Sequence, residues 1–367
     1  MTVVAGRVVT PEGVLTDGYV SISGERIVSV GSGGPSASAW VVPGFVDMHV
    51  HGGGGHSFTS GELASARGAA AFHAAHGTTT LLASLVTAPL ELMLAATRAY
   101  APLVQAGVIA GIHFEGPYLA RSRCGAQHPA HLRTPSTVEL AGLLDAGAGA
   151  VRMVTVAPEL PGALDLIRLL AARGVVAAVG HTDATYAQTV AAISAGATVG
   201  THVFNAMRPL HHREPGPVPA LLGAAGVTCE VVADGVHLHD AMLRLAATAA
   251  GPGRVALVTD AVAASGMADG DYELGGQEIV VTGGVVRLAR DGAIAGSTLT
   301  MDAALRRAVH AGLSMVDAVR MAATTPAAAL RLADVGALVA GRRADLVVLD
   351  DDLTVRQVMR AGAWVAR

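Results

Sequence analysis

The sequence predicts an α/β protein: a (β/α)8 TIM-like barrel with a small β domain formed from the N- and C-terminal segments. Three observations carry this prediction. Short Val- and Ile-rich runs alternate eight times with Ala- and Leu-rich helical patterns, both ends of the chain are rich in β-branched residues, and 51% of the 367 residues are hydrophobic. Eight alternating strands and helices are typical of a closed barrel, whereas an open α/β sheet, the alternative, rarely needs eight such units.

The two ends of the chain contain strand patterns broken by Gly and Pro, and the first forty residues contain no helix of useful length. We therefore predict a small β domain made from residues 1–42 and 334–367, flanking a barrel at residues 43–333. The strand patterns of the two ends cover residues 2–9, 19–22, 26–30, 345–349 and 363–365.

The middle of the chain supplies the predicted barrel. After the eighth strand the rhythm breaks: residues 272–288 predict a hairpin insert, and helices follow at 301–311 and 315–332. The predicted barrel strands are residues 41–51, 78–87, 108–116, 151–158, 175–182, 198–205, 228–235 and 254–261, and helical patterns include 62–76, 90–104, 164–173 and 186–195.

Composition excludes several classes of function. With a net charge of −4, the chain lacks the excess of positive charge that binding to nucleic acid or to an anionic membrane surface would need. No run of about 18 uncharged apolar residues predicts a membrane span, and residues 1–9 show no export signal. The two cysteines, Cys124 and Cys229, argue against a disulfide framework. We expect a cytoplasmic protein.

The basic residues exclude several further types of functional site. All 25 of them are arginine, so the chain contains no lysine. This rules out a P-loop lysine, a Schiff-base lysine and a carboxylated-lysine metal bridge.

Candidate metal ligands and acid–base groups fall at the carboxyl ends of the predicted strands, where barrel enzymes place their catalytic residues. These residues are His49, His51, Glu115, His181, His202 and Asp260. His49 and His51 lie two apart in a strand, so both imidazoles face the same side and can share one ion. One such residue alone is usually structural, but this ordered set predicts a metal site suited to Zn²⁺, Fe²⁺, Co²⁺ or Ni²⁺. Without lysine, Glu115 is the natural carboxylate ligand.

Eight short segments resemble the amidohydrolase superfamily and, within it, the N-acetylglucosamine-6-phosphate deacetylases. The resemblance extends from about residue 41 to about residue 330. His-x-His alone is a weak signal, whereas the ordered set is specific. The segments are PGFVDMHVH at 43–51, HFEGPYL at 113–119, GHTDA at 180–184, HVFNAM at 202–207, REPG at 213–216, DGVH at 234–237, TDA at 259–261 and AGSTL at 295–299.

This resemblance implies a reaction and a cofactor. The reaction is metal-dependent hydrolysis of the N-acetyl group of N-acetylglucosamine 6-phosphate, giving glucosamine 6-phosphate and acetate in amino-sugar metabolism. Glu115, His181 and His202 would be the main metal ligands, and His49 and His51 match the branch of the family in which a second ion binds. The implied cofactor is one or two divalent ions per subunit, namely zinc, with Fe, Co, Ni or Mn as alternatives.

The resemblance also implies roles around the substrate. Asp260 would act first as general base and then as general acid, and His128 aligns with the histidine that polarises the scissile carbonyl. Arg213 would reach the phosphate from the neighbouring subunit, which implies a homodimer. The remaining sugar-phosphate contacts would come from Asn205, the backbone of Ala206 and His237.

Three other functions stay open from the sequence. A deacetylase of N-acetylgalactosamine 6-phosphate differs by the configuration of one hydroxyl. Another amidohydrolase acting on an N-acyl or cyclic amide is a second alternative, although the dihydroorotase type usually needs a carboxylated lysine. The third is a non-catalytic sugar-phosphate sensor, against which the presence of Asp260 argues, since a sensor needs no general base.

Overall fold

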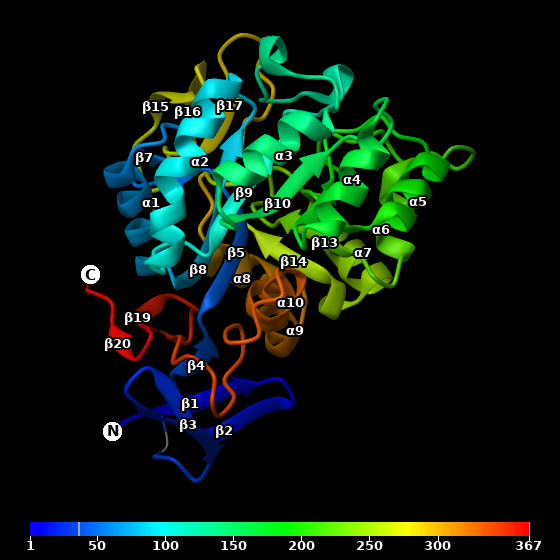
Figure 1. Cartoon of the computed structure of the whole chain (residues 1–367). Helices are drawn as coiled ribbons and strands as arrows, with labels where there is room; N and C mark the ends of the chain where they lie inside the picture. Colours follow the sequence, from blue (N-terminus) through cyan, green and yellow to red (C-terminus); the bar gives the residue numbers. More distant parts are fainter. Residues whose placement is uncertain (36, 367) are drawn as a thin grey trace.

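The computed structural model describes residues 1–35 and 37–366 and shows a parallel eight-stranded barrel with a seven-stranded sheet at one end (Figure 1). The barrel strands follow chain order, and the first and last meet: the backbone N–H of Asp260 donates to the His49 carbonyl at 2.9 Å, and that of His51 to the Ala261 carbonyl at 2.8 Å. The predicted fold class is confirmed. The barrel strands are β5 (Phe45–Val50), β8 (Thr78–Val86), β9 (Gly111–Glu115), β10 (Val151–Val156), β11 (Val176–Val179), β12 (Ala197–Gly200), β13 (Thr228–Val232) and β14 (Val255–Val258).

Helices cover the outside of the barrel. α5 (Tyr186–Ala195) shows how the sequence sets their ends: Thr185 and Gln188 form a reciprocal capping box, and Gly196 ends the helix in the left-handed region at φ 119°. Among the described residues, no helix is both long enough and apolar enough to cross a bilayer. The other helices around the barrel are α1 (Leu63–Ala75), α2 (Leu90–Gln105), α3 (Thr137–Ala146), α4 (Ala163–Ala172), α6 (Pro217–Gly223) and α7 (Asp240–Ala250), with short 3₁₀ turns η1 (Arg121–Arg123), η2 (Pro129–His131) and η3 (Pro252–Arg254).

The end sheet joins strands from both ends of the chain, in the order β20-β19-β18-β4-β1-β2-β3. Some of its buried residues, such as Val8, Val41 and Val348, form a core of their own, while others, such as Val42 and Val347, pack into the core of the barrel. The exact domain boundaries, 1–42, 43–333 and 334–367, stay a prediction. The strands are β1 (Thr2–Thr10), β2 (Gly13–Ser23), β3 (Arg26–Ser32), β4 (Trp40–Pro43), β18 (Leu346–Leu349), β19 (Val355–Arg360) and β20 (Ala363–Trp364).

The first predicted barrel strand, residues 41–51, is two strands. β4 belongs to the end sheet and β5 to the barrel, and Gly44 separates them. A Cβ at Gly44 would lie 2.2 Å from the Thr79 hydroxyl oxygen, so only glycine lets the chain pass this close to β8.

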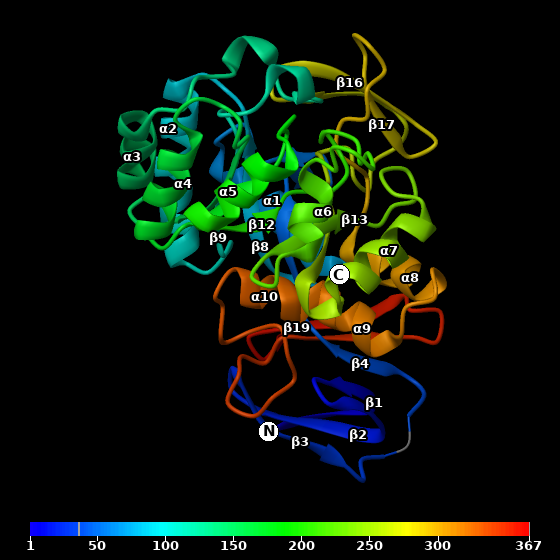
Figure 2. The ribbon, with the colours of Figure 1, turned by 90° about the vertical axis from the view of Figure 1, so that its right-hand side faces the viewer.

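The insert after the eighth strand is a three-stranded antiparallel sheet of β15 (Gly270–Leu274), β16 (Gln277–Thr282) and β17 (Val285–Leu288). It lies at the end of the barrel opposite the end sheet (Figures 1 and 2). A two-stranded ribbon of β6 (Gly52–Gly53) and β7 (His56–Ser57) follows β5.

The chain between the insert and the end sheet is helical. α8 (Met301–His310) matches its prediction, but the predicted helix at 315–332 consists of α9 (Met315–Val319), a π-helical turn η4 (Arg320–Thr324) and α10 (Thr325–Ala329). Pro326 explains the change, because proline has no backbone N–H for the regular helical bond and its ring clashes with the carbonyl four residues earlier.

Candidate metal centre and active-site cavity

The six residues singled out at the strand ends converge at the carboxyl end of the barrel and are at most 7% exposed. Glu115 ends β9, while His181, His202 and Asp260 each follow a barrel strand by two residues. These last three have positive φ angles of 46°, 27° and 49°, which are uncommon for residues other than glycine. The backbone therefore holds three candidate site residues in strained conformations, as functional sites often do.

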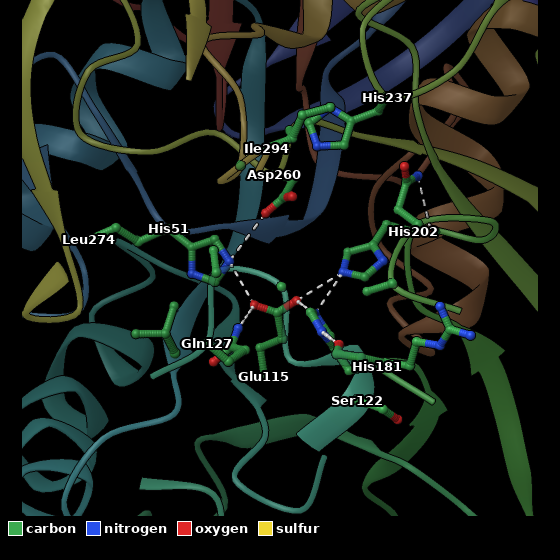
Figure 3. A pocket seen from close by; sticks show the side chains of 17 residues that line it. His51, Glu115, Ser122, Gln127, His181, His202, His237, Asp260, Leu274 and Ile294 are labelled. Carbon is green, nitrogen blue, oxygen red and sulfur yellow. Dashed lines mark hydrogen bonds and ion pairs between the residues drawn. The ribbon is translucent and has the colours of Figure 1, made fainter. Parts of the chain in front are cut away.

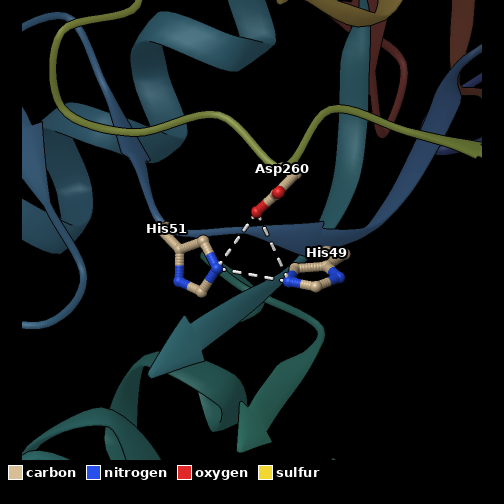
Figure 4. A group of neighbouring side chains, drawn as sticks. All are labelled: His49, His51 and Asp260. Carbon is tan, nitrogen blue, oxygen red and sulfur yellow. Dashed lines mark hydrogen bonds and ion pairs between the residues drawn. The ribbon is translucent and has the colours of Figure 1, made fainter. Parts of the chain in front are cut away.

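The six side chains form two groups, each with its ligand atoms within 4.8 Å of one another. In the first group, Glu115 Oε1 lies 2.9 Å from His181 Nε2 and 3.0 Å from His202 Nε2 (Figure 3). The second group contains His49, His51 and Asp260 (Figure 4). Glu115 joins the groups, since its other oxygen, Oε2, lies 3.2 Å from His51 Nε2.

The protonation of two of these imidazoles follows from their outer partners. His51 Nδ1 lies 3.1 Å from the Ser84 carbonyl oxygen, and His181 Nδ1 lies 2.8 Å from that of Arg123. A carbonyl oxygen can only accept, so Nδ1 is the donor in both rings. In the neutral imidazole, Nε2 then directs a lone pair into the centre, which is the arrangement of a metal-ligating histidine.

The centre brings acceptors together in a way that requires a cation. His49 Nε2 lies 3.2 Å from His51 Nε2, and His181 Nε2 lies 3.1 Å from His202 Nε2. Neutral imidazoles with their protons on Nδ1 would repel each other at these distances, and would equally repel the carboxylate of Glu115. Protons or divalent ions between them remove the repulsion, and a set of imidazole and carboxylate donors fits a divalent transition metal.

The ionisation of the centre agrees with this. Burial would raise the pKa of Glu115, but the charges of His49 and His181 hold it well below its usual range. Burial would likewise raise the pKa of Asp260, but the charge of His49 and a hydrogen bond from His51 lower it to about 2. Burial would lower the pKa of His51, but hydrogen bonds to Asp260 and Glu115 raise it to about 9. At neutral pH both carboxylates are ionised and the centre attracts positive charge.

A cavity of about 360 Å³ opens over the two groups. His51, Glu115, His181, His202 and Asp260 form part of its wall (Figure 3). This volume lies within the range of small-molecule sites. The rest of the lining consists of Val86, Ser122, Arg123, Gly125, Ala126, Gln127, Asn205, Ala206, His237, Leu274, Ile294 and Gly296.

The sequence pattern of the Amidohydrolase family matches residues 40–365. The chain belongs to this family.

Several relatives of this amidohydrolase have named activities. It is 38% identical to an N-acetylgalactosamine-6-phosphate deacetylase of Escherichia coli O157:H7, over 98% of this chain and 97% of the relative. It is 35% identical to an N-acetylglucosamine-6-phosphate deacetylase of Bacillus subtilis, over 95% and 92%. Among solved structures, a variant of N-acetyl-D-glucosamine-6-phosphate deacetylase from Mycobacterium smegmatis, in complex with N-acetyl-D-glucosamine-6-phosphate, matches with a TM-score of 0.97 and 51% identity, over 100% of this chain and 99% of that one.

Three of the predicted substrate residues line the cavity of this amidohydrolase, namely Asn205, Ala206 and His237. His237 is held by Asp234, whose Oδ2 lies 2.6 Å from its Nδ1. Burial would lower the pKa of His237, but the hydrogen bond and the charge of Asp234 raise it. This favours the protonated form of His237, which can offer a positive charge to an anionic substrate.

The structure does not bring His128 into this cavity. His128 lies beside a separate surface hollow, where its Nδ1 accepts the Ala130 N–H and its ring packs 4.6 Å from that of His131. Its neighbour Gln127 points inward instead and is 2% exposed. The Thr87 N–H donates to Gln127 Oε1 at 2.7 Å, which leaves the amide nitrogen to donate to Glu115 at 2.5 Å. Gln127 is therefore the residue of this pair that lines the cavity, and the catalytic role of His128 stays a prediction.

Arg213 also lies outside the cavity of its own chain. It is exposed on the loop before α6, and its guanidinium lies 3.0 Å from His212 Nε2. This position leaves its predicted contact with a second subunit untested.

Two further residues belong to the site, and sequence reasoning missed the second of them. Arg123 lines the cavity while its guanidinium binds Asp183 at 2.8 and 3.0 Å. Glu230 lies beneath the cavity with its side chain fully buried against His49. One signal was present for Glu230: a single acidic residue inside the apolar strand segment TCEVV needs a buried partner.

Proposed function

We propose that this amidohydrolase removes the N-acetyl group of N-acetylglucosamine 6-phosphate, forming glucosamine 6-phosphate and acetate. The observation that carries the proposal is that five of the six candidate metal ligands, Asp260 among them, line one cavity. The relative of known structure that is 51% identical was solved in complex with this same substrate.

The metal part of the proposal rests on the donor set. Glu115, His181 and His202 would hold one divalent ion, and His49, His51 and Asp260 would hold a second. Zinc suits these imidazole and carboxylate ligands, with Fe, Co, Ni and Mn as alternatives. When bound, such an ion lowers the pKa of water towards about 7 and polarises the acetyl carbonyl.

Asp260 would move the protons. Its carboxylate is ionised at neutral pH, because neighbouring positive charge lowers its pKa, and an ionised carboxylate can accept a proton as water adds to the acetyl carbon. It then delivers that proton to the amide nitrogen while the C–N bond breaks. The nitrogen leaves as a neutral amine, the new C–O bond remains in acetic acid, and Asp260 returns to its ionised form. The acid then passes its proton to the amine, which gives acetate and the ammonium form of the product.

Gln127 is better placed than His128 to bind the acetyl oxygen. Its amide group lines the cavity, and the Thr87 N–H fixes which end is the nitrogen. One of the two amide hydrogens goes to Glu115, so the second is available to a substrate. A donor to a developing oxyanion contributes roughly 3–4 kcal/mol in other hydrolases.

The phosphate would be bound by Asn205, the backbone N–H of Ala206 and the ring of His237, whose pKa Asp234 raises. Arg213 would complete the site from a second subunit, which makes the functional unit a homodimer. A planar guanidinium suits a phosphate because it donates two parallel hydrogen bonds. We also propose a cytoplasmic location, which the two free cysteines support.

The experiment that tests this function measures acetate release from N-acetylglucosamine 6-phosphate by purified enzyme, after chelation and after addition of single metals. Activity should vanish with the metal and return with it. The galacto epimer is the second candidate substrate, because a relative that is 38% identical is named for it; the ratio of kcat/KM for the two sugars decides between them. Binding of the sugar phosphate without turnover under any metal would instead support a sensor.

A further inference from the structure

A buried carboxylate outside the two ligand groups contacts both of them. Glu230 lies on β13, and its side chain and that of His49 are both 0% exposed. Glu230 Oε2 lies 3.1 Å from His49 Nδ1 and accepts the backbone N–H of His202 at 3.2 Å. One oxygen thus links a ring of the second group to the main chain of the first.

His49 is held differently from the other histidines. His51 and His181 direct Nδ1 at backbone carbonyls, whereas His49 directs it at a carboxylate. With its proton on Nδ1, His49 presents the lone pair of Nε2 to His51 and Asp260, 3.2 and 3.6 Å away. A carboxylate partner also makes an imidazole a stronger ligand than a carbonyl partner does.

A purely structural role would not require the charge of Glu230. Its second oxygen, Oε1, is buried without a hydrogen-bond partner among residues 1–35 and 37–366. An ionised group in such surroundings loses its hydration, and a neutral amide would satisfy the His202 N–H at lower cost. No arginine of the described chain donates a hydrogen bond to Glu230, so its compensating charge has to come from the metal centre.

We propose that Glu230 is a positioning residue: it commits His49 to ligation through Nε2, and its charge retains a second divalent ion at the group of His49, His51 and Asp260. The inference rests on the proposed metal centre. That group contains one carboxylate of its own, Asp260, and shares Glu115 with the first group. Glu230 supplies the further negative charge that a second doubly charged ion in a buried site needs.

The test compares Glu230→Gln with a matched control, Asp47→Asn. Glutamine keeps an acceptor for His49 and His202 and removes the charge. Asp47 is also a buried carboxylate that accepts the backbone N–H of His49, at 3.2 Å, but it does not contact the imidazole ring. The readouts are zinc content per chain after dialysis and the two zinc dissociation constants from competition with a chromophoric chelator.

Wild type and Asp47→Asn should hold two zinc ions. In Glu230→Gln, the dissociation constant of the weaker ion should rise by about 10- to 100-fold while that of the tighter ion changes less than about threefold. Unchanged constants in Glu230→Gln, or the same loss in Asp47→Asn, would overturn the assignment. A wild type with one ion would refute the second site alone, and a wild type with none would refute the metal-dependent function as well.

A measurement on the unaltered protein covers the case in which Glu230→Gln does not fold. Long-range ¹H–¹⁵N spectra of zinc-loaded protein with labelled histidine report which ring nitrogen carries the proton. The His49 signals should show a protonated Nδ1 and a metal-bound Nε2. A proton on Nε2 with Nδ1 bound to zinc would contradict the proposal.

Discussion

Replacing His73 by glutamine should make the folded protein less sensitive to acid. His73 lies on α1, is fully buried, and its Nε2 is 2.8 Å from the carbonyl oxygen of Gly52, the residue after His51. Since that carbonyl only accepts, Nε2 carries the proton. Nδ1 is buried and has no partner in the described parts of the chain. Burial lowers the pKa of His73 from 6.5 to about 4.

The size of the effect follows from the two pKa values. The unfolded chain binds a proton on His73 below about pH 6.5, and the folded chain only below about pH 4. Between these values the unfolded state holds more protons, so the free energy of unfolding falls as the pH falls. For this single group the loss between pH 7.5 and pH 5 is roughly 2 kcal/mol.

Urea denaturation at pH 7.5 and pH 5 measures this difference. Other groups titrate in the same window, so the relevant quantity is the loss in wild type minus the loss in His73→Gln, which should be roughly 2 kcal/mol. Glutamine keeps an N–H for the Gly52 carbonyl and cannot titrate. His211→Gln, a change at an exposed histidine, should follow wild type. An equal loss in wild type and His73→Gln would show that His73 is not the acid-sensitive group.

Three further predictions concern the active site. Asp260→Asn should lower kcat by about 10²- to 10⁴-fold and still bind an ion at the group containing Glu115; normal turnover would remove Asp260 from the mechanism. Arg213→Ala should raise KM for the phosphorylated sugar by about tenfold or more and change kcat little, and an unaltered KM would place the phosphate elsewhere. Gln127→Ala should lower kcat by about 10²-fold while His128→Ala stays within about twofold of wild type; the reverse order would restore the role first predicted for His128.

The sequence predicts the barrel well because its strands are buried on both faces. The barrel strands are then short and mainly apolar runs, and runs of this kind stand out between helical patterns. The break at Gly44 is invisible to that reasoning, because the close approach of Thr79 that demands glycine comes from a different strand. The sequence does contain a local signal for the π-helical turn, namely Pro326, but helical periodicity alone predicts a continuing helix there.

The residues of the candidate site also fall into those that the sequence predicts and those that it does not. Residues such as Glu115 and His181 follow from position alone, since the carboxyl ends of parallel strands share one end of the barrel. The choice between Gln127 and His128 depends on which way an irregular loop turns its side chains, and no periodicity encodes that. Glu230 lies within a strand rather than at its end, so its link to His49 appears only when the barrel closes and brings β13 and β5 into one layer.

The end sheet pairs strands that are synthesised before the barrel with strands that are synthesised after it. Val41 of β4 pairs with Val348 of β18, so a sheet begun before the barrel is synthesised is completed only after it. Until β18 emerges, the edge of β4 that it will cover has no partner, although β1 already pairs along the other edge. An open strand edge is a template for pairing with other chains. A nascent chain of this protein therefore carries this aggregation hazard throughout translation of the barrel, and loses it only when β18 arrives.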